Sequence, residues 1–511
     1  MSFTVRRLKE PPKHRFPWKR SLLWGITFAR PLLGWYQSWK RRQQEEHQAM
    51  LLKRILFVLI AIFLAFFLLA GTAKALFGLK SLGLKTLVSV TGGELPVDAS
   101  GYTNILLLGQ GDSGHDGKDL TDTLMVASID PTHTQSVVVV SLPRDLYFLA
   151  TEKMSKGRIN SLYRDYKGYL RGTGMETPAA SKEAMHELSL EIGRTLGMEI
   201  HGVIKVDFEG FVDAVDVIGG IDVTVPEDIV DTEYPDENYG YETFSLSSGP
   251  QHLDGATALK YVRSRHSSSD FSRSARQQQI IIAMAEKSKA EKLHRDVGAI
   301  TELLSVMREH VETTFGIREL IALGGVADKI DRTRVVTMQL SDRNGLYNSL
   351  PQPGGFLYAP PRELFGGASV LLPVSIPEYP VTWKQVQALS KILFSKRSLY
   401  LSTPQISILN AGARPGSARA LSNELVRYGF DVDYVNNADT LPDQEKSWIF
   451  ERSAAEQTPE VAFFIDLLKL PTKASTELTA EEIRTVTIVL GKDYTYRPVQ
   501  DLLLAQETPA E

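Results

Sequence analysis

The amino-acid sequence predicts an α/β (α+β) sandwich with a central mixed sheet, a second small α/β domain after it, and one N-terminal transmembrane helix before it. Three observations predict this organisation. Short apolar runs alternate with amphipathic helical stretches. A length of 511 residues exceeds that of a single domain. One long segment near the N-terminus carries no charge. The contents of 43% hydrophobic and 23% charged residues are ordinary for globular protein.

The uncharged segment predicts the membrane topology. Residues 55–73 are 19 residues without a charge, which is enough to cross the hydrocarbon core as a helix. Residues 1–54 carry 13 Lys and Arg against 3 Glu, so the positive-inside rule places them in the cytoplasm. We expect a transmembrane helix over 55–77 and a single-pass protein of the cell membrane. Its N-terminus is then cytoplasmic and its bulk extracytoplasmic.

The expected cytoplasmic segment, residues 1–54, combines its basic residues with four of the six tryptophans. This composition suits contact with an anionic inner leaflet, and a partly disordered tail that only fixes topology is the alternative. We expect no nucleic-acid binding, because no recognition fold fits into so short a segment. The chain has no cysteine, which excludes disulfides, thiolate metal sites and a cysteine nucleophile.

The first folded domain is expected over residues 101–345, behind a stalk at 78–100. The segment 130–135 predicts a hairpin turn between two strands, and Gly219 with Gly220 predicts the end of a helix. The expected strands cover residues 104–109, 123–129, 136–142, 201–207 and 221–225, and the expected helices cover 181–197, 208–218 and a short stretch at 253–259.

The second domain is expected over residues 404–495, after a Gly- and Pro-rich boundary region at 346–403. A strand at 406–410, a helix at 417–428 stopped by Gly429, and strands at 432–435 and 485–491 are expected in it. Its pattern suits envelope or partner binding, and a simple spacer is the alternative. The acidic tail, 496–511, is expected to fray.

A run of arginines is the strongest functional signal. Residues 261–279 hold Arg263, Arg265, Arg273 and Arg276 with a single acid, Asp270. We expect Arg263 and Arg265 to share one side of an extended segment, and Arg273 and Arg276 to share one face of a helix. Guanidinium groups match phosphate oxygens bidentately, so the run predicts a pocket for more than one phosphate. A solvated basic face is the alternative interpretation.

Other segments add groups of the same kind. Arg144 and Asp145 follow an apolar strand, Arg158 lies on a loop, and Asp122 precedes a strand. Phosphoryl chemistry uses cations to hold developing charge, and a carboxylate to bind Mg²⁺ or to deprotonate a hydroxyl. Surface salt bridges are the competing explanation for any one of these residues. The Gly-rich loop 109–117 is no Walker A motif, and no Gly-x-Ser-x-Gly elbow occurs.

Taken together, these segments resemble the LytR-CpsA-Psr family over roughly residues 101–330. The segment around 406–439 is similar to the LytR C-terminal domain that accompanies some members. The motifs that carry the first resemblance are Asn104–Gly109, Asp122-Thr123, Ser141-Leu-Pro-Arg-Asp145, Arg158-Ile-Asn-Ser161, Val206-Asp-Phe208, Gly219-Gly-Ile-Asp222, Leu253-Asp-Gly255 and Tyr261–Gln279.

The resemblance implies a transferase of the cell envelope. Such proteins move a glycopolymer from a polyprenyl-pyrophosphate lipid to a peptidoglycan hydroxyl as a phosphodiester, with Mg²⁺ at the pyrophosphate and the lipid in an apolar tunnel. The implied partners are thus the lipid-linked glycan, peptidoglycan and the membrane. The implied catalytic residues are Asp122, Arg144 and Asp145. The implied pyrophosphate-binding residues are Arg144, Arg158, Arg263, Arg265, Arg273, Arg276 and Gln277, and the metal would be held by Asp122 and Asp112.

The sequence departs from the family at one position of the expected metal site. Gly111 stands where the family usually has a second aspartate, and Asp112 follows one residue later. The alternative hypothesis is therefore an envelope-binding or regulatory protein that keeps the pyrophosphate pocket without catalysing transfer.

Overall fold

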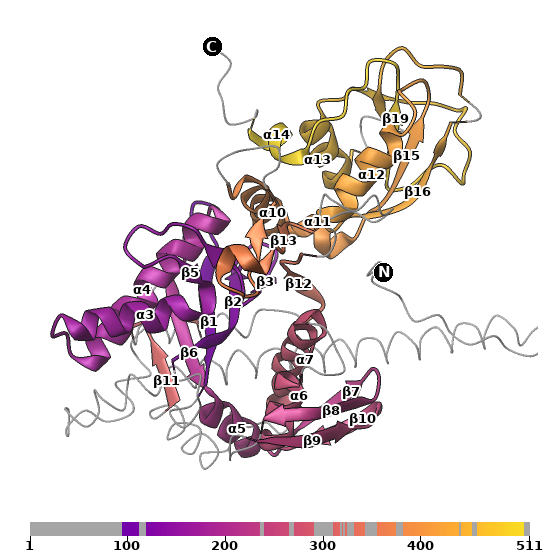
Figure 1. Ribbon diagram of the computed structural model, residues 1–511. Helices are drawn as coiled ribbons and strands as arrows, with labels where there is room; N and C mark the ends of the chain where they lie inside the picture. The colour runs from indigo at the N-terminus through magenta and orange to yellow at the C-terminus, as the bar shows by residue number, and fades with distance from the viewer. Residues whose placement is uncertain are drawn as a thin grey trace, which may run out of the picture.

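The computed structural model describes residues 95–111, 119–235, 240–264, 270–290, 310–316, 319, 322–323, 332–342, 355–374, 382–438, 441–451 and 457–504 (Figure 1). The predicted cytoplasmic segment, transmembrane helix and acidic tail beyond 504 lie outside these residues. Among the helices described, none is long and apolar enough to cross a membrane.

A six-stranded mixed sheet forms the centre of the first domain, as predicted. Its strand order is β11-β6-β1-β2-β3-β12. The antiparallel strands β1, β2 and β3 form a meander, and β6 and β12 extend it in parallel on either side. The strands are β1 (Thr103–Gln110), β2 (Thr121–Ile129), β3 (Val137–Leu142), β6 (Gly202–Asp207), β11 (Val311–Thr313) and β12 (Val335–Gln339).

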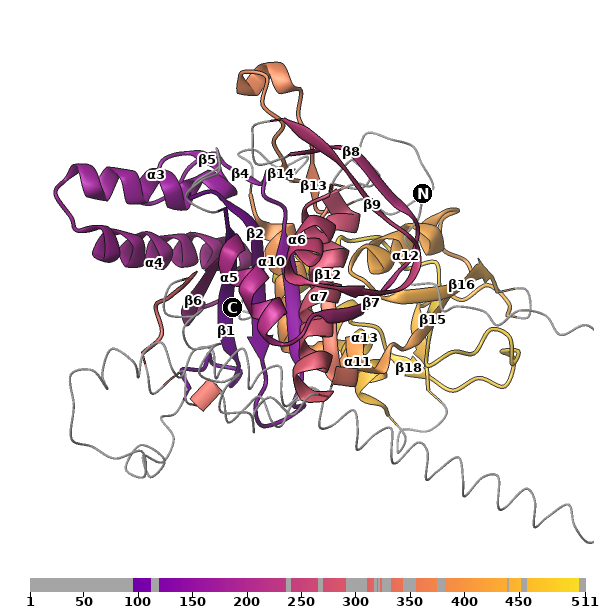
Figure 2. The same ribbon diagram turned by 90° about the horizontal axis from the view of Figure 1, so that it is seen from below.

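Each face of the sheet is covered by helices, because alternate side chains of a strand point to opposite faces. On one face, Leu106 and Leu124 pack with Leu162 of α3 (Ile159–Gly172) and Leu188 of α4 (Thr177–Leu196). On the other face, Ile105 and its neighbours pack against α5 (Phe208–Val217), α6 (Gly255–Arg263) and α7 (Asp270–Ala290). Figure 2 shows α3 and α4 projecting together from one side of the molecule.

Short two-stranded sheets surround this core. They pair β4 (Tyr147–Phe148) with β5 (Gly157–Arg158), β7 (Ile221–Val225) with β10 (Gly249–Leu253), β8 (Ile229–Pro235) with β9 (Tyr241–Leu246), and β13 (Leu357–Tyr358) with β14 (Leu372–Pro373). A 3-10 helix, η3 (Arg362–Phe365), lies between β13 and β14, and η2 (Arg332–Arg334) precedes β12.

The second domain is a five-stranded sheet in the order β16-β15-β19-β17-β18. Its strands are β15 (Gln405–Asn410), β16 (Asp431–Asn437), β17 (Trp448–Phe450), β18 (Thr472–Lys473) and β19 (Val486–Leu490), with helices α12 (Ser417–Arg427), α13 (Pro459–Leu468) and α14 (Val499–Leu504). The predicted strands and the helix before Gly429 are therefore present, and Gly429 has a left-handed φ of 88°.

The two domains share one apolar core. The boundary region contains α10 (Lys384–Ser395) and α11 (Arg397–Ser402). Leu389 of α10 belongs to the same buried cluster as Leu188 of α4 and Ile406 of β15. Gln387 Nε2 also donates a hydrogen bond of 2.9 Å to the carbonyl of Arg194 at the end of α4. The described part of the predicted boundary region therefore contains two helices, and α10 packs against both domains.

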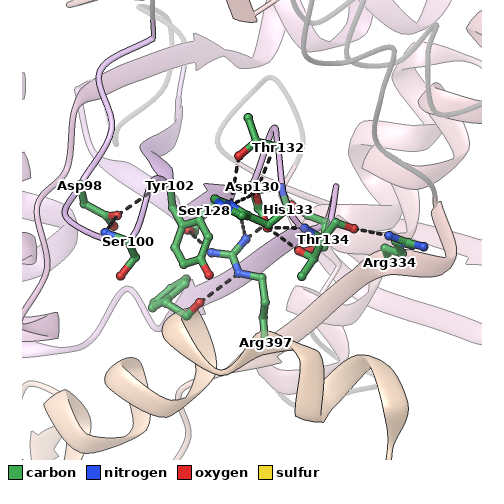
Figure 3. Close-up of polar contacts among 12 residues, drawn as sticks. Asp98, Ser100, Tyr102, Ser128, Asp130, Thr132, His133, Thr134, Arg334 and Arg397 are labelled. Atoms are coloured by element: carbon green, nitrogen blue, oxygen red, sulfur yellow. Dashed lines mark hydrogen bonds and ion pairs between the residues drawn. The ribbon is translucent and has the colours of Figure 1, made fainter. Parts of the chain in front are cut away.

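Arg397 joins α11 to the central sheet at the C-terminal end of β2 (Figure 3). Its side chain is 1% exposed and donates to the carbonyls of Ser128 and Phe394, at 3.2 and 3.0 Å, and to Ser128 Oγ at 2.8 Å. The guanidinium also lies 3.7 Å from the centre of the Tyr102 ring. Burial lowers the pKa of Arg397, and the Tyr102 ring and the carbonyls around the guanidinium compensate for the lost water.

Candidate functional site

The candidate site lies at one edge of the central sheet, where β2 begins and β3 and β12 end. Asp122 and Leu124 of β2, Ser141 to Arg144, and Gln339 of β12 line a small pocket that opens to solvent. Arg273 and Gln277 complete the pocket from α7, which packs on the sheet face opposite to α3 and α4. The structure thus brings Asp122, Arg144, Arg273 and Gln277, which are far apart in the sequence, into one pocket.

Carboxylates orient the arginines of this edge. Arg144 NH1 lies 3.5 Å from Asp122 Oδ1, and Arg144 Nε lies 3.9 Å from Asp145 Oδ1. Arg158 NH1 also approaches Asp145 Oδ1, at 3.4 Å. Because Asp145 pairs with both guanidinium groups, it holds them side by side while each stays partly exposed. Asp145 and Arg158 therefore adjoin the pocket.

Asn160 holds Asp122 in place, although the sequence reasoning assigned it no role. Its Nδ2 donates to Asp122 Oδ1 at 3.1 Å, and its backbone N–H donates to the Arg144 carbonyl at 3.4 Å. Its own carbonyl accepts a hydrogen bond of 3.3 Å from Thr121 Oγ1. The first turn of α3 thereby connects the start of β2 to the loop after β3. Its signal in the sequence was its place two residues after Arg158 in the Arg158-Ile-Asn-Ser161 motif.

Arg276 lies behind the pocket. It is buried, and its Nε donates to the Tyr261 carbonyl at 2.8 Å while its NH2 donates to the Ser264 carbonyl. Burial lowers the pKa of this guanidinium. These contacts satisfy carbonyls at the end of α6, which a helix leaves without intrahelical partners. In this structure Arg276 fixes α6 against α7, and a direct contact with pyrophosphate stays a prediction.

Three consecutive glutamines anchor α7 to three different segments. Gln277 Nε2 donates to Thr123 Oγ1 and Gln278 Nε2 to Ser141 Oγ, each at 3.0 Å. Gln279 Nε2 donates to the Thr224 carbonyl at 2.8 Å. Together they fix the helix above the sheet edge and so place Arg273 in the pocket. The prediction named Gln277 alone, because the family resemblance implied a role for that glutamine only.

The expected extended conformation around Arg263 is wrong. Arg263 is the last residue of α6, so the alternation argument for Arg263 and Arg265 does not hold. The helix continues to Arg263 because Asp254 caps it, accepting from the Thr257 N–H at 2.8 Å. Gly255 then brings the helix against α5, where a Cβ would collide with the Val212 carbonyl.

The Arg263 guanidinium stacks on aromatic rings beside the pocket. It lies 4.6 Å from the centre of the Phe208 ring and 5.6 Å from that of Tyr234. Cation–π contacts of this kind orient the guanidinium plane. Arg263 does not belong to the residues that line the pocket. Arg265 and Asp112 lie outside the described residues, and so does the loop from 112 to 118.

The oxygen donors at Asp122 are suited to a divalent cation. Asn160 Oδ1, beside Asp122, is buried and has no hydrogen-bond partner. Mg²⁺ takes one or two protein carboxylates and keeps several waters, so the partly exposed Asp122 carboxylate is a ligand of the kind it uses. Within the described part of the chain, no group of three or more His, Asp or Glu side chains could hold a metal. The second predicted ligand, Asp112, lies outside the described residues.

Comparisons with protein families match both domains. The chain matches the LytR_cpsA_psr family over residues 82–352. It matches the family described as "LytR cell envelope-related transcriptional attenuator" over residues 403–494.

Among curated proteins, the chain is similar to two named teichoic acid transferases. It is 28% identical over 243 residues to the polyisoprenyl-teichoic acid–peptidoglycan teichoic acid transferase TagV of Bacillus subtilis, covering 47% of this chain and 56% of the relative. It is 30% identical over 219 residues to TagU of Bacillus cereus, covering 42% of this chain and 62% of the relative. The chain therefore spans less than two thirds of these relatives.

Among solved structures, the chain is similar to B. subtilis TagV, with a TM-score of 0.40, 23% identity, and coverage of 58% of this chain and 98% of that one. A structure of TagT bound to LI-WTA gives a TM-score of 0.39 and 19% identity, covering 59% of this chain and 93% of that one.

Proposed function

This chain belongs to the LytR-CpsA-Psr family, and we propose on that basis that it is a membrane-anchored transferase. The proposed reaction moves a glycopolymer from a polyprenyl-pyrophosphate carrier to a hydroxyl of peptidoglycan. The hydroxyl oxygen bonds to the phosphorus next to the glycan, and the bond from that phosphorus to the bridging oxygen breaks. Polyprenyl phosphate leaves, and the product is a phosphodiester. The names of the similar teichoic acid transferases support this proposal.

The convergence of Arg144 and Arg273 on one pocket with Asp122 is the observation that carries the proposal. Two guanidinium groups from separate elements can bind the two phosphates of a pyrophosphate and hold the charge that develops on its bridging oxygen. Arg158, held beside Arg144 by Asp145, adds a third cation at the rim. Arg263 and Arg265 are proposed to contact the same ligand from the α6–α7 side.

The carboxylates have two proposed tasks. Asp145, which bridges Arg144 and Arg158, is proposed to accept the proton of the attacking hydroxyl or to keep both cations oriented. Asp122, with Asn160 beside it, is proposed to hold Mg²⁺, and Asp112 is proposed as a further ligand. When bound, Mg²⁺ would neutralise phosphate charge.

The lipid is proposed to lie along the sheet face below α7. Several apolar side chains are only partly buried there and pack against the cluster of Ile105 and its neighbours: Leu107, Val137, Val206 and Met284. Apolar surface of this kind suits a polyprenyl chain. The proposed anchor at residues 55–77 would keep the pocket next to the membrane that supplies this lipid, which raises the effective substrate concentration.

A non-catalytic envelope-binding or regulatory protein is the second candidate. The observation that favours it is Gly111, which directly follows β1 and has no side chain at the position where the family usually has an aspartate. A pocket that keeps its arginines but has weaker metal support would bind the lipid pyrophosphate and turn it over slowly or not at all.

The deciding experiment uses the full-length protein in detergent micelles with a polyprenyl-pyrophosphate-linked glycan, peptidoglycan and Mg²⁺. Release of polyprenyl phosphate and capture of glycan on peptidoglycan are measured together with affinity for the lipid. The transferase predicts both products, and Arg144→Ala should lose them along with lipid affinity. Tight binding without either product favours the regulatory candidate. Unchanged lipid affinity in a folded Arg144→Ala variant removes the pocket from both proposals.

A further inference from the structure

The helical hairpin of α3 and α4 carries a pair of stacked tyrosines on its surface. Tyr166 and Tyr169 are three residues apart and share one flank of α3. Their ring centres are 6.0 Å apart and their planes differ by 20°. Tyr169 is 65% exposed and Tyr166 is half-buried. The two rings therefore form a small platform that the fold leaves open to solvent.

A charged rim borders this platform. Glu187 of α4 pairs with Lys153 through its Oε1, and Glu183, one turn earlier on α4, lies close to both Tyr166 and Lys153. Glu187 is 1% exposed, and its second oxygen, Oε2, is buried with no hydrogen-bond partner. A buried acceptor of this kind in a native structure is usually satisfied by an ordered water molecule.

The platform and its rim have the chemistry of a carbohydrate site. Aromatic faces stack against the C–H faces of a pyranose ring, while the partly exposed Glu183 carboxylate and the exposed Lys153 ammonium group beside them can hydrogen-bond to its hydroxyls. An aromatic pair that served the core alone would be buried like Tyr163, which is fully buried one turn before Tyr166. Here Tyr169 is exposed to solvent instead.

The hairpin also begins at the candidate site. The first turn of α3 carries Asn160, and Arg158 immediately precedes the helix. Tyr166 and Tyr169 follow Arg158 by eight and eleven residues, so a rise of 1.5 Å per residue places them about 12 and 16 Å away along the axis. In Figure 2, α3 runs outward from β5, away from the sheet. A polymer that leaves the pocket along α3 reaches the platform within a few sugar units.

The local charge selects between the two polymers of the proposed reaction. The charged groups that act most strongly on Tyr166 are the carboxylates of Glu187 and Glu183 and the ammonium group of Lys153, two negative charges to one positive. A donor chain rich in phosphate would be repelled by this rim, whereas an uncharged sugar backbone would not. The exposed Arg164 does not change this balance, because Asp165 pairs with it at 2.8 Å.

We propose that the stacked tyrosines of the α3–α4 hairpin bind an uncharged glycan chain and hold the acceptor strand during transfer. The assignment to the acceptor rests on the proposed function. The affinity for neutral sugar does not, since it depends only on the platform and its rim.

The test measures sugar binding without any transfer. The full-length protein in detergent micelles is titrated by calorimetry with a soluble β-1,4-linked N-acetylglucosamine oligomer. Tyr169→Ala should weaken this binding by roughly three- to ten-fold, the effect of one lost aromatic contact. Tyr169→Phe, which keeps the ring, should bind like the unchanged protein. Tyr241→Ala is the matched control, because Tyr241 is 70% exposed on β9.

Three results would overturn the proposal. One is the absence of oligomer binding by the unchanged protein, and another is equal affinity for Tyr169→Ala and the unchanged protein at the same thermal stability. The third is tighter binding of poly(glycerol phosphate) than of the neutral oligomer at this platform, which would assign it to an anionic polymer.

The acceptor role has its own readout. In the transfer assay, Tyr169→Ala should raise the KM for peptidoglycan while the KM for the lipid-linked glycan stays unchanged. If transfer is absent but the oligomer still binds through Tyr169, the sugar platform stands and the transferase proposal fails. A rise in the KM for the donor alone would contradict the acceptor role.

Discussion

At the scale of single residues, the pocket depends on side chains that are held in place by their neighbours. Asp122 is the carboxylate of the pocket, and both Asn160 and Arg144 lie within 3.5 Å of its Oδ1. A negative charge is therefore held at the same point by an amide and a cation. Replacing the charge while keeping the shape separates its chemical role from its structural one.

Asp122→Asn should reduce turnover roughly 100-fold while lowering lipid affinity much less, because the amide keeps a hydrogen-bonding shape but loses the charge. Single-turnover release of polyprenyl phosphate and equilibrium lipid binding measure the two effects separately. Asp222→Asn, in an exposed carboxylate on β7, is the control. Equal turnover in Asp122→Asn and the unchanged protein would remove Asp122 from the chemistry.

Arg276 tests the distinction between binding and positioning. Arg276→Met should destabilise the fold by about 1–3 kcal/mol, because the Tyr261 and Ser264 carbonyls lose their buried donor. Urea unfolding measures this loss. If Arg276 only positions α6 and α7, lipid affinity measured well below the unfolding temperature should fall little. A large loss of affinity at full stability would show that Arg276 contacts the pyrophosphate itself.

At the scale of elements, the β2–β3 turn shows how one carboxylate orders a segment. Asp130 accepts hydrogen bonds from the backbone N–H groups of Thr132, His133 and Thr134, at 3.1, 2.9 and 2.6 Å, and from Thr134 Oγ1. Burial by itself would raise the pKa of Asp130, but these hydrogen bonds outweigh it and lower the pKa from 3.8 to about 2. The turn therefore depends on the ionised form.

The pH dependence of stability follows from this shift. A folded-state pKa below the unfolded value gives stability that is fully present above the unfolded pKa of 3.8 and is lost as the pH falls through about 2. Asp130→Asn should therefore be less stable than the unchanged protein at pH 7, and the gap should narrow between about pH 5 and pH 2. Chemical unfolding at several pH values checks this. A constant gap across that range would contradict it.

The α7 helix shows how an element is placed by more than its apolar face. Ile280 and Ala283 pack into the same apolar cluster as Ile105. The position of the helix over the pocket is fixed by the glutamines at 277–279. An apolar stripe fixes which side of a helix faces inward, and it tolerates small rotations. Hydrogen bonds to three partners allow no such rotation, so they determine where Arg273 lies.

At the scale of the whole molecule, Arg397 connects the second domain to the sheet. Its partner Ser128 lies 269 residues earlier in the sequence. The same region receives the first described residues of the chain, through Tyr102. One guanidinium therefore contacts three parts of the chain (Figure 3): the segment that leads into β1, the end of β2, and α11 before the second domain.

Arg397→Met should lower the free energy of unfolding by about 2–4 kcal/mol, because several buried acceptors and an aromatic ring lose their cation. Differential scanning calorimetry should then resolve two transitions in place of one, since the domains are less tightly joined. Arg419→Met, at an exposed position of α12, is the control and should leave the transition unchanged. A single transition at the same temperature in Arg397→Met would show that the apolar core alone joins the domains.

The sequence by itself determined the elements that depend on neighbouring residues. The strands at 104–109 and 136–142, the turn at 130–135 and the helix before Gly429 were predicted because alternation, turn residues and caps act over a few positions. Four site residues that short motifs and the family resemblance implied, Asp122, Arg144, Arg273 and Gln277, meet in one pocket. The predicted membrane helix also rests on a local property, although it lies outside the described residues.

Only the tertiary structure decided which side chains become partners. Asn160 holds Asp122 across 38 residues of sequence, and Arg276 points to backbone carbonyls instead of into the pocket. Arg263 lies in a helix and not in the predicted extended segment, because Asp254 caps that helix and Gly255 lets it pack closely against α5. The physical reason is common to all three. Hydrogen bonds and close packing act between atoms that the fold brings within a few ångströms, and no local pattern in the sequence records which atoms those are.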